Sequence, residues 1–282
     1  MISRLCSLQR KVNLPLLFLP VFFLAACGSP PLRQPRAMEQ ANKADQAAHR
    51  ALHDGDLMRA RELFRQAILM QQSLDNLPAS AEAAINLSYV SHKLGDDGAA
   101  LLLLDNILRQ DNALIPSELR TSAAFRKGII LADNGKVAEA ELALQLADQS
   151  CNNQCVYTAG INNLRARLAL DKGDFGTALS TAKTVINAGA EKQEMANSQR
   201  IAAAAESALN HHEAALLYYN AALELDKELA LSARIYEDLT GIAKVLAKLG
   251  RKPEAEEFAR RADAVILASR ELTIKSEKKA TP

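Results

Sequence analysis

The chain has 282 residues, of which 49% are hydrophobic and 24% charged, so it can form a sizeable core and does not have the composition of a disordered protein. Aromatic residues make up only 4% and Trp is absent, while Ala and Leu are abundant, which favours an all-α fold over a β sandwich or barrel. The net charge of +1 excludes the basic excess expected of a nucleic-acid-binding protein.

The first 27 residues have the features of a secretory signal. A basic segment over residues 1–11 precedes an apolar run over residues 12–24, which is too short for a comfortable membrane span. The sequence Leu-Ala-Ala-Cys then ends at Cys27. This segment resembles the lipobox of bacterial lipoproteins, and the resemblance implies cleavage before Cys27, diacylation of its thiol and acylation of its amino group. An ordinary signal peptide with an incidental cysteine is the alternative.

Lipidation at Cys27 would anchor the mature protein permanently, because three acyl chains far exceed the single chain that gives only marginal membrane binding. Gly28 stands where an inner-membrane retention signal would usually have Asp. The resemblance therefore points to the outer membrane of a Gram-negative cell, with the protein facing the periplasm. Removing the three basic residues of the signal from a chain of +1 would leave a mature charge of −2.

Residues 28–36 are rich in proline and have no apolar periodicity. We expect residues 1–26 to be removed and residues 27–37 to form the lipidated cysteine and an extended tether of about 25–30 Å. The folded body is expected to begin near Met38.

Six turn-like sites divide the remaining chain at nearly constant intervals. Their marker residues are separated by 40, 40, 38, 37 and 40 residues, and are Gly55, Gly95, Gly135, Gly173, Asn210 and Gly250. Five residues after each marker the chain has alanine, at Ala60, Ala100, Ala140, Ala178, Ala215 and Ala255. Twelve residues after each marker stands a small or aliphatic residue. The two positions are two helical turns apart, so they lie on one face of a helix that must approach its neighbour closely.

An amphipathic stretch also precedes each marker, as residues 84–90 precede Gly95. Each unit is therefore expected to form a helix A, a tight turn in which Gly or Asn tolerates positive φ, and a helix B. This pattern resembles the tetratricopeptide repeat family, whose helix A and helix B consensus is similar to residues 86–100 and 215–226. The resemblance covers residues 38 to about 268 and implies an all-α, right-handed solenoid of about six repeats.

The sequence also departs from the usual repeat. The period is several residues longer than is typical of the family, so we expect longer A helices or longer turns between repeats, with Pro78, Pro116 and Pro253 at helix starts. A generic helical bundle is the simplest alternative, but a bundle has no reason to place alanine at a fixed offset from six turns. The apolar stripe ends after Arg270, which predicts a frayed or disordered tail over residues 269–282.

Cys151 and Cys155 lie between the third helix B and the fourth helix A. In an oxidising compartment they are expected to form a disulfide that pins this turn and contributes about 2 kcal/mol. A redox-active pair is the alternative, although the two-residue spacing typical of such pairs is absent.

The sequence has no recognisable catalytic motif, and we expect neither a metal nor a cofactor. His49 and His53 are four residues apart on one helix, a spacing that can bind metal, but no acidic base accompanies them and a solvated helix face is the simpler interpretation. The sequence has no nucleophile elbow, phosphate loop, dinucleotide fingerprint or zinc-protease motif in its mature part.

The A helices of such a solenoid line its concave surface. The resemblance places the candidate groove residues at Tyr89, Phe125, Asn163, Arg167, Arg200 and Lys244. The second half of the groove, with Arg167, Arg200 and Lys244, is the more basic. It is therefore expected to bind a carboxylate or carbonyl oxygens of an extended peptide or partner helix. We therefore expect an envelope-anchored scaffold or assembly factor that binds a protein partner. A regulator or accessory subunit of polysaccharide or peptidoglycan machinery is the alternative.

Overall fold

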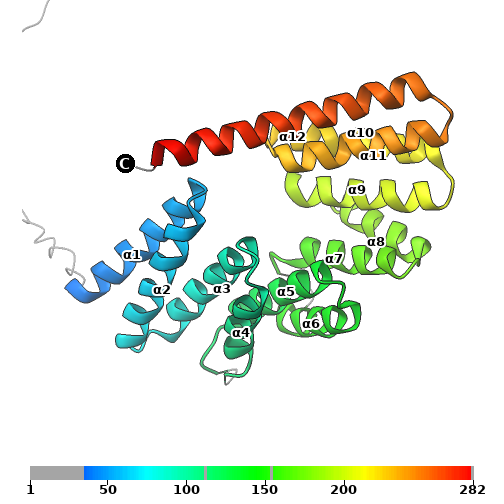
Figure 1. Ribbon diagram of the computed structural model, residues 1–282. Coiled ribbons are helices and arrows are strands. Elements are labelled where there is room, and N and C mark those ends of the chain that lie inside the picture. Colours follow the sequence, from blue (N-terminus) through cyan, green and yellow to red (C-terminus); the bar gives the residue numbers. More distant parts are fainter. Residues whose placement is uncertain (1–34, 111–112, 153–154, 281–282) are drawn as a thin grey trace, which may run out of the picture. The chain divides into compact units, whose positions relative to one another are not determined.

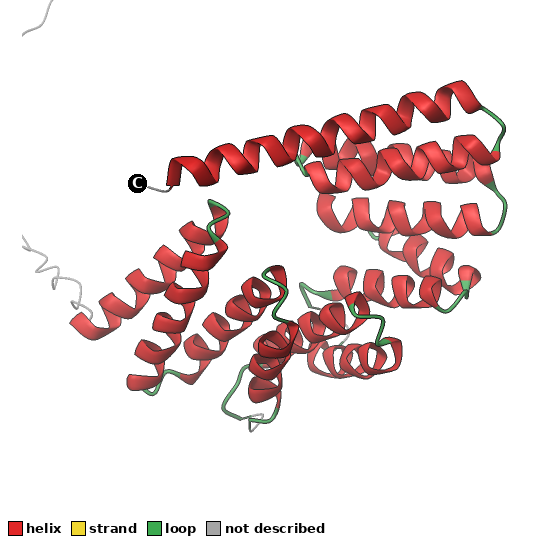
Figure 2. Cartoon of the chain, in the orientation of Figure 1, coloured by secondary structure: helices red, strands yellow, loops and turns green. Residues whose placement is uncertain are grey.

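The computed structural model describes residues 35–110, 113–152 and 155–280, and in these ranges it has twelve α-helices and no strand. In chain order the helices are α1 (Arg36–His53), α2 (Leu57–Ser73), α3 (Leu77–Lys93), α4 (Asp97–Leu108), α5 (Ser117–Asp133), α6 (Val137–Cys151), α7 (Thr158–Asp171), α8 (Phe175–Asn187), α9 (Lys192–Ala208), α10 (His212–Glu228), α11 (Ser232–Lys248) and α12 (Lys252–Ala280), and Figures 1 and 2 follow them along the chain. The predicted signal peptide and Cys27 lie outside the described residues, as does most of the tether. None of the helices in these ranges is both long enough and apolar enough to span a membrane.

The helices pack in the order in which they follow one another. Each odd-numbered helix packs against the even-numbered helix after it, and each even-numbered helix packs against the next odd-numbered one. From α3 to α11, each odd-numbered helix also contacts the next odd-numbered helix. This nearest-neighbour pattern defines an all-α solenoid of six pairs, with helices A at odd numbers and helices B at even numbers, as the sequence predicted.

The six marker residues form the turns within the pairs. All six have positive φ values, between 65° and 80°. Three of them are followed by an aspartate that caps helix B, since the side chains of Asp56, Asp96 and Asp174 each accept a hydrogen bond from a backbone N–H three residues ahead. The chain therefore reverses at the marker, and helix B begins two residues after it. This confirms the predicted helix–turn–helix unit.

Small residues make the close contacts inside each pair. The alanines five residues after the markers are all buried, and so are the residues twelve after them: Ala67, Ile107, Ala147, Val185, Ala222 and Ala262. Larger apolar side chains fill the spaces between successive pairs, for example Phe64, Leu104 and Leu168, which are almost completely buried. Because every layer is covered by the next, the core runs through the stack as a series of clusters.

The longer period of the repeat comes largely from long A helices, since five of the six have 17 or 18 residues. Pro78 and Pro253 lie in the first turns of α3 and α12, and Pro116 caps α5. In the described part of the chain α12 runs past Arg270 to Ala280, and the frayed or disordered tail over residues 269–282 stays a prediction.

A buried ionic network joins the fifth and sixth repeats. The Arg200 guanidinium of α9 donates from Nε to Asp238 Oδ1 of α11 at 2.7 Å and from Nη2 to Asp226 of α10. Asp226 and Asp238 are almost fully buried, at 1% and 0% exposure. Burial is the main reason why the pKa of Asp238 is raised to about 7, against the opposing effect of Arg200.

Close approach of helices should make Gly241 intolerant of a side chain. A Cβ at this position in α11 would overlap the ring of Tyr219 in α10, with Cζ only 2.5 Å away. We expect Gly241→Ala to lower the free energy of unfolding by about 1–3 kcal/mol, because the ring must move within a packed core. The matched control is Gly98→Ala in α4, where a Cβ meets no atom within 4 Å, and this change should stabilise by up to about 1 kcal/mol. Equal effects of the two changes in urea unfolding would contradict the close contact.

The raised pKa of Asp238 predicts an unusual dependence of stability on pH. The folded state retains a proton up to about pH 7 that the unfolded chain releases near the ordinary value of 3.8, so this group makes the free energy of unfolding fall as pH rises between these values. Asp238→Asn, which cannot ionise, should remove this contribution. The free energy of unfolding of the variant minus that of the wild type should therefore be larger at pH 8 than at pH 5. Parallel stability profiles of the two proteins from pH 4 to 8 would show that the assignment is wrong.

Candidate functional site

All six predicted groove residues lie on A helices, but they differ in how much of each side chain is free. We call the face that carries them, from α3 to α11, the A-helix surface. Tyr89 and Phe125 of α3 and α5 are half-buried, as is Arg167 of α7. Lys244 of α11 is exposed, and Asn163 and Arg200 are largely enclosed by the protein.

Two positive charges lie close to the Tyr89 ring. The Arg126 guanidinium carbon is 4.9 Å from the centre of the Tyr89 ring, and the Lys93 ammonium nitrogen is 5.5 Å from the same point. Arg126 is contributed by α5 and Lys93 by the last turn of α3. Both cations therefore face the negative π surface of one phenol ring.

Phe125 lies beside this group and contacts the following repeat. Its ring is 6.1 Å from that of Tyr157, which caps α7, with an angle of 50° between the planes. A Cβ at Gly160 would lie 2.7 Å from Phe125 Cζ, so the absence of a side chain at Gly160 lets the ring rest on α7. The aromatic contact thus joins α5 to the start of α7.

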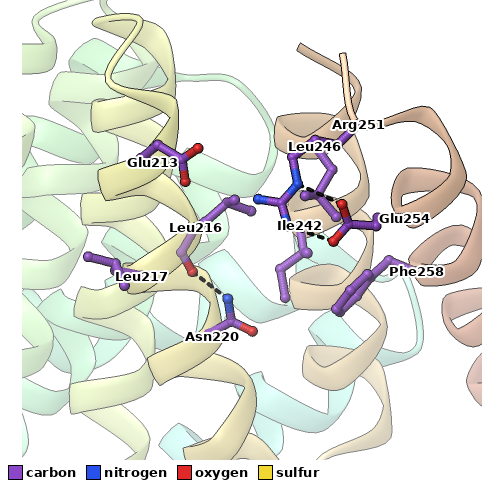
Figure 3. Close-up of a pocket in the computed structure, with 9 residues that line it drawn as sticks. All are labelled: Glu213, Leu216, Leu217, Asn220, Ile242, Leu246, Arg251, Glu254 and Phe258. Carbon is purple, nitrogen blue, oxygen red and sulfur yellow. Dashed lines mark hydrogen bonds and ion pairs between the residues drawn. The ribbon is translucent and has the colours of Figure 1, made fainter. Parts of the chain in front are cut away.

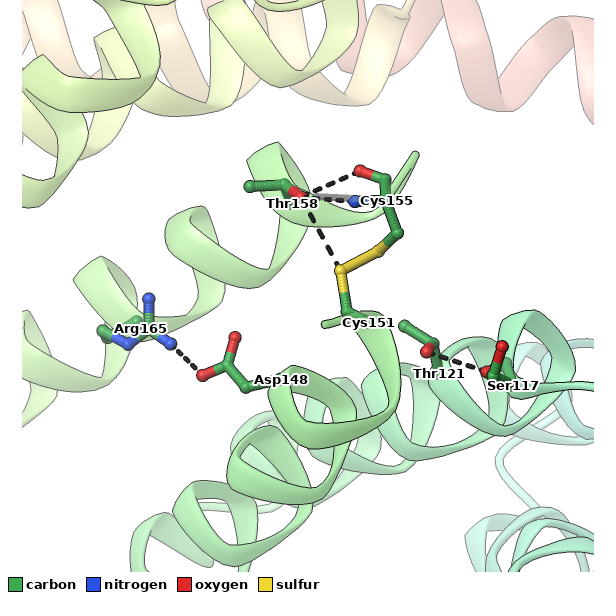
Figure 4. Close-up of a disulfide and its surroundings, with 7 residues drawn as sticks. All are labelled: Ser117, Thr121, Asp148, Cys151, Cys155, Thr158 and Arg165. Atoms are coloured by element: carbon green, nitrogen blue, oxygen red, sulfur yellow. Dashed lines mark hydrogen bonds and ion pairs between the residues drawn. A yellow bond between two sulfur atoms is a disulfide. The ribbon is translucent and has the colours of Figure 1, made fainter. Parts of the chain in front are cut away.

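The disulfide holds the turn that carries Tyr157. Cys151, the last residue of α6, is bonded to Cys155, and their Cα atoms are 5.3 Å apart. Thr158 in the first turn of α7 accepts a hydrogen bond from the Cys155 N–H and donates one to the Cys155 carbonyl oxygen (Figure 4). Asp148 of α6 also forms an ion pair with Arg165 of α7 (Figure 4). The cysteine pair therefore joins the third repeat to the fourth.

Arg167 takes part in a chain of charges that crosses three repeats. Its Nη1 donates to Asp133 Oδ1 at 2.6 Å, and Asp133 Oδ2 is 3.1 Å from His92 Nε2. His92 Nδ1 is in turn 2.6 Å from Asp97 Oδ1, and hydrogen bonds from His92 and Asn134 hold the pKa of Asp97 below its ordinary value. Arg167 is thus already paired within the protein.

Asn163 and Arg200 are not available in the way that the sequence predicted. Asn163 is only 5% exposed, and its Nδ2 donates to the backbone oxygen and to the carboxylate of Glu194 in α9, at 2.9 and 2.7 Å. Ser198 donates to the Asn163 Oδ1 at 2.6 Å. Arg200 is held by Asp226 and Asp238, so both predicted groove residues bind neighbouring repeats instead. The predicted basic half of the groove is therefore largely neutralised by the protein's own carboxylates.

Lys244 is exposed beside a shallow hollow of about 420 Å³ between α11 and α12. The hollow is lined by small residues of both helices, including Ala243, Ala247 and Ala259. The residues equivalent to Ala243 in earlier repeats include Ala48, Ala166 and Ala203, which are fully buried, and no described helix follows α12. Among the described residues, Arg167 and Arg200 are paired with carboxylates, whereas Lys244 forms no ion pair.

A second cavity, of about 400 Å³, lies between α10, α11 and α12 (Figure 3). Leu216, Leu217, Ile242, Leu246 and Phe258 give it apolar walls. At its rim Arg251 and Glu254 form an ion pair that raises the pKa of the arginine and lowers that of the glutamate (Figure 3). Glu213 and Asn220 also line the cavity, so it combines apolar walls with a carboxylate and an amide.

Sequence reasoning missed Arg126 and Tyr157, because the family pattern marks Phe125 but not its neighbour as groove-facing. Arg126 stands 37 residues after Tyr89, about one helical turn short of a full repeat of 40 residues. The described residues contain no cluster of His, Cys, Asp or Glu that could hold a metal ion. The chemistry that this surface offers is binding through aromatic faces and cations.

Comparison with known proteins gives a family match and a set of structures with the same fold. Residues 46–115 match the tetratricopeptide repeat family, and no curated protein matches the sequence. A Rap protein complexed with Competence and Sporulation Factor is 15% identical with a TM-score of 0.61, covering 82% of this chain and 66% of that one. The apo form of RapI is 13% identical with a TM-score of 0.59, covering 84% and 67%. BtubC (BKLC) from P. vanneervenii is 15% identical with a TM-score of 0.53, covering 84% and 93%.

At these identities the neighbours establish the fold alone, whereas the family match identifies the repeats at residues 46–115. The marker turns and buried alanines continue the same unit through α12. Residues 46–115 therefore match the tetratricopeptide repeat family, and the helix pairs that follow have the same helix–turn–helix architecture.

Proposed function

We propose that the protein is a membrane-anchored, non-catalytic scaffold of the cell envelope that binds a partner polypeptide on its A-helix surface. The observation that carries the proposal is the stack of six tetratricopeptide helix pairs, because this fold presents an extended surface for binding other proteins. The solved Rap protein of the same fold is complexed with Competence and Sporulation Factor.

The A-helix surface has the chemistry of a binding surface between Tyr89 and Tyr157. Aromatic side chains supply large contact areas at small cost in conformational entropy, and arginine adds charge and directed hydrogen bonds, which is why both are enriched at the centres of protein interfaces. Tyr89, Phe125, Arg126 and Tyr157 are all partly exposed.

The B helices offer a second surface that must be distinguished by experiment. Leu102, Leu142 and Leu217 occupy the same position in three repeats, seven residues after the marker, and all three are exposed, at 58%, 68% and 75%. Separated leucines of this kind are common on soluble proteins. The A-helix surface, with its continuous aromatic and cationic group, is therefore the surface that we assign to the partner.

The envelope location in this proposal rests on the lipobox at Cys27. In fractionated Gram-negative cells, the wild type should sediment with outer membranes, and Cys27→Ala should abolish sedimentation with membranes because the chain loses its acyl chains. Gly28→Asp is the matched control: it keeps the cysteine and should move the protein to the inner membrane. A Cys27→Ala protein that still sediments with membranes would disprove the lipid anchor.

A photo-crosslinking amino acid placed in the full chain tests which surface binds the partner. Positions 89 and 244 on the A-helix surface should yield crosslinked protein bands in intact cells, and position 142 on helix B should not. Bands from position 142 alone would rule out the A-helix surface as the binding surface. Absence of bands from all three positions would contradict the scaffold function itself.

A further inference from the structure

Five Lys or Arg side chains of the described A helices form ion pairs with carboxylates of neighbouring helices. The pairs are Lys127 with Asp105, Arg165 with Asp148, Arg167 with Asp133, Lys192 with Glu228, and Arg200 with Asp226 and Asp238. Arg126 and Lys93 differ from this pattern. Among the residues that the structure describes, no carboxylate lies within ion-pair distance of either one.

Arg126 is the more constrained of these two cations. Its Nε is shielded from solvent and has no hydrogen-bond partner. Burial lowers the pKa of its guanidinium below the ordinary value, and the only opposing influences are the phenols of Tyr89 and Tyr157. A buried charge normally has an ion-pair or hydrogen-bond partner, because the loss of hydration is costly. Contact with one aromatic face compensates this loss only in part.

The surroundings of Arg126 combine charge with apolar area. Lys93 adds a second cation close to the Tyr89 ring, so two positive charges lie within about 6 Å of one phenol. Phe125 and Tyr157 lie next to it and are joined to α7 by the Gly160 contact and to α6 by the disulfide. The aromatic wall is therefore held in place by two repeats and does not have to be ordered when a ligand binds.

We propose that Arg126, Lys93 and Tyr89 form a binding site for the side-chain carboxylate of an Asp or Glu residue in the partner polypeptide. The fork of guanidinium N–H groups suits the two oxygens of a carboxylate, and Lys93 adds a second donor. Phe125 and Tyr157 contact an apolar residue next to that acidic residue. This inference rests on the proposed scaffold function and names the chemistry that its A-helix surface recognises.

The test uses a displayed library of random peptides selected on the detergent-solubilised full-length protein. The selected peptides should share an acidic residue flanked by an apolar one. Replacement of that Asp by Asn, or of Glu by Gln, should weaken binding by at least about tenfold, since a charge-assisted pair is lost. This arm changes nothing in the protein, so it is independent of any folding defect.

Arg126→Met gives the second arm, because methionine keeps the apolar stem and removes the charge. The variant should bind the selected peptides at least about tenfold more weakly, and its urea midpoint should equal or exceed that of the wild type, since an uncompensated charge has been removed. Arg261→Met is the matched control: Arg261 stacks on Phe258 of α12 at 4.6 Å, away from the A-helix surface, and binding should not change. If Arg126→Met lowers the midpoint instead, Arg126→Lys, which keeps the charge, should recover part of the binding.

The outcomes separate this inference from the function on which it rests. Peptides selected without a preference for acidic residues, or bound equally by Arg126→Met, would overturn the carboxylate site and leave the scaffold intact. Failure to select any peptide, together with absence of crosslinks in cells, would overturn both.

Discussion

Close approach of helix A and helix B within each pair is the constraint on which the rest of this structure depends. It requires a small residue at the crossing in every repeat, and the alanines five residues after the six markers meet that requirement. Because the two helices of each pair lie close together, successive pairs can stack on one another in the same way. The repeated surface along the A helices is a consequence of this regular stacking.

The stacking also determines how the charges of the protein are used. Arg200, Arg167 and His92 each lie opposite carboxylates of an adjacent repeat, so they join repeats to one another. The buried pair of Arg200 with Asp238 contributes less to stability than its geometry suggests, because both partners lose hydration. The effect of these pairs on the surface is larger, since they remove charges that a partner could otherwise contact. Arg126 and Lys244 remain outside these pairs, and only Arg126 stands beside a cluster of aromatic side chains.

Much of the fold could be predicted from the sequence, because its determinants are local and periodic. Gly or Asn at a positive φ, alanine at a fixed offset and proline at helix starts each have one structural meaning, and each was found where it was predicted. The site was harder to predict. The burial of Asn163 and Arg200 depends on partners 31 to 38 residues away, Glu194 and Asp238, which the family pattern does not mark. Whether a surface cation is free is decided by such distant pairings.

The structure of the protein bound to a peptide selected on it would test most directly where the partner binds. We predict an Asp or Glu carboxylate about 2.7–2.9 Å from the guanidinium nitrogens of Arg126, with Tyr89 still stacked below that group. The apolar neighbour of the acidic residue should contact Phe125 and Tyr157. A peptide that lies along the exposed leucines of the B helices, with Arg126 unchanged and unpaired, would contradict the assignment of the A-helix surface.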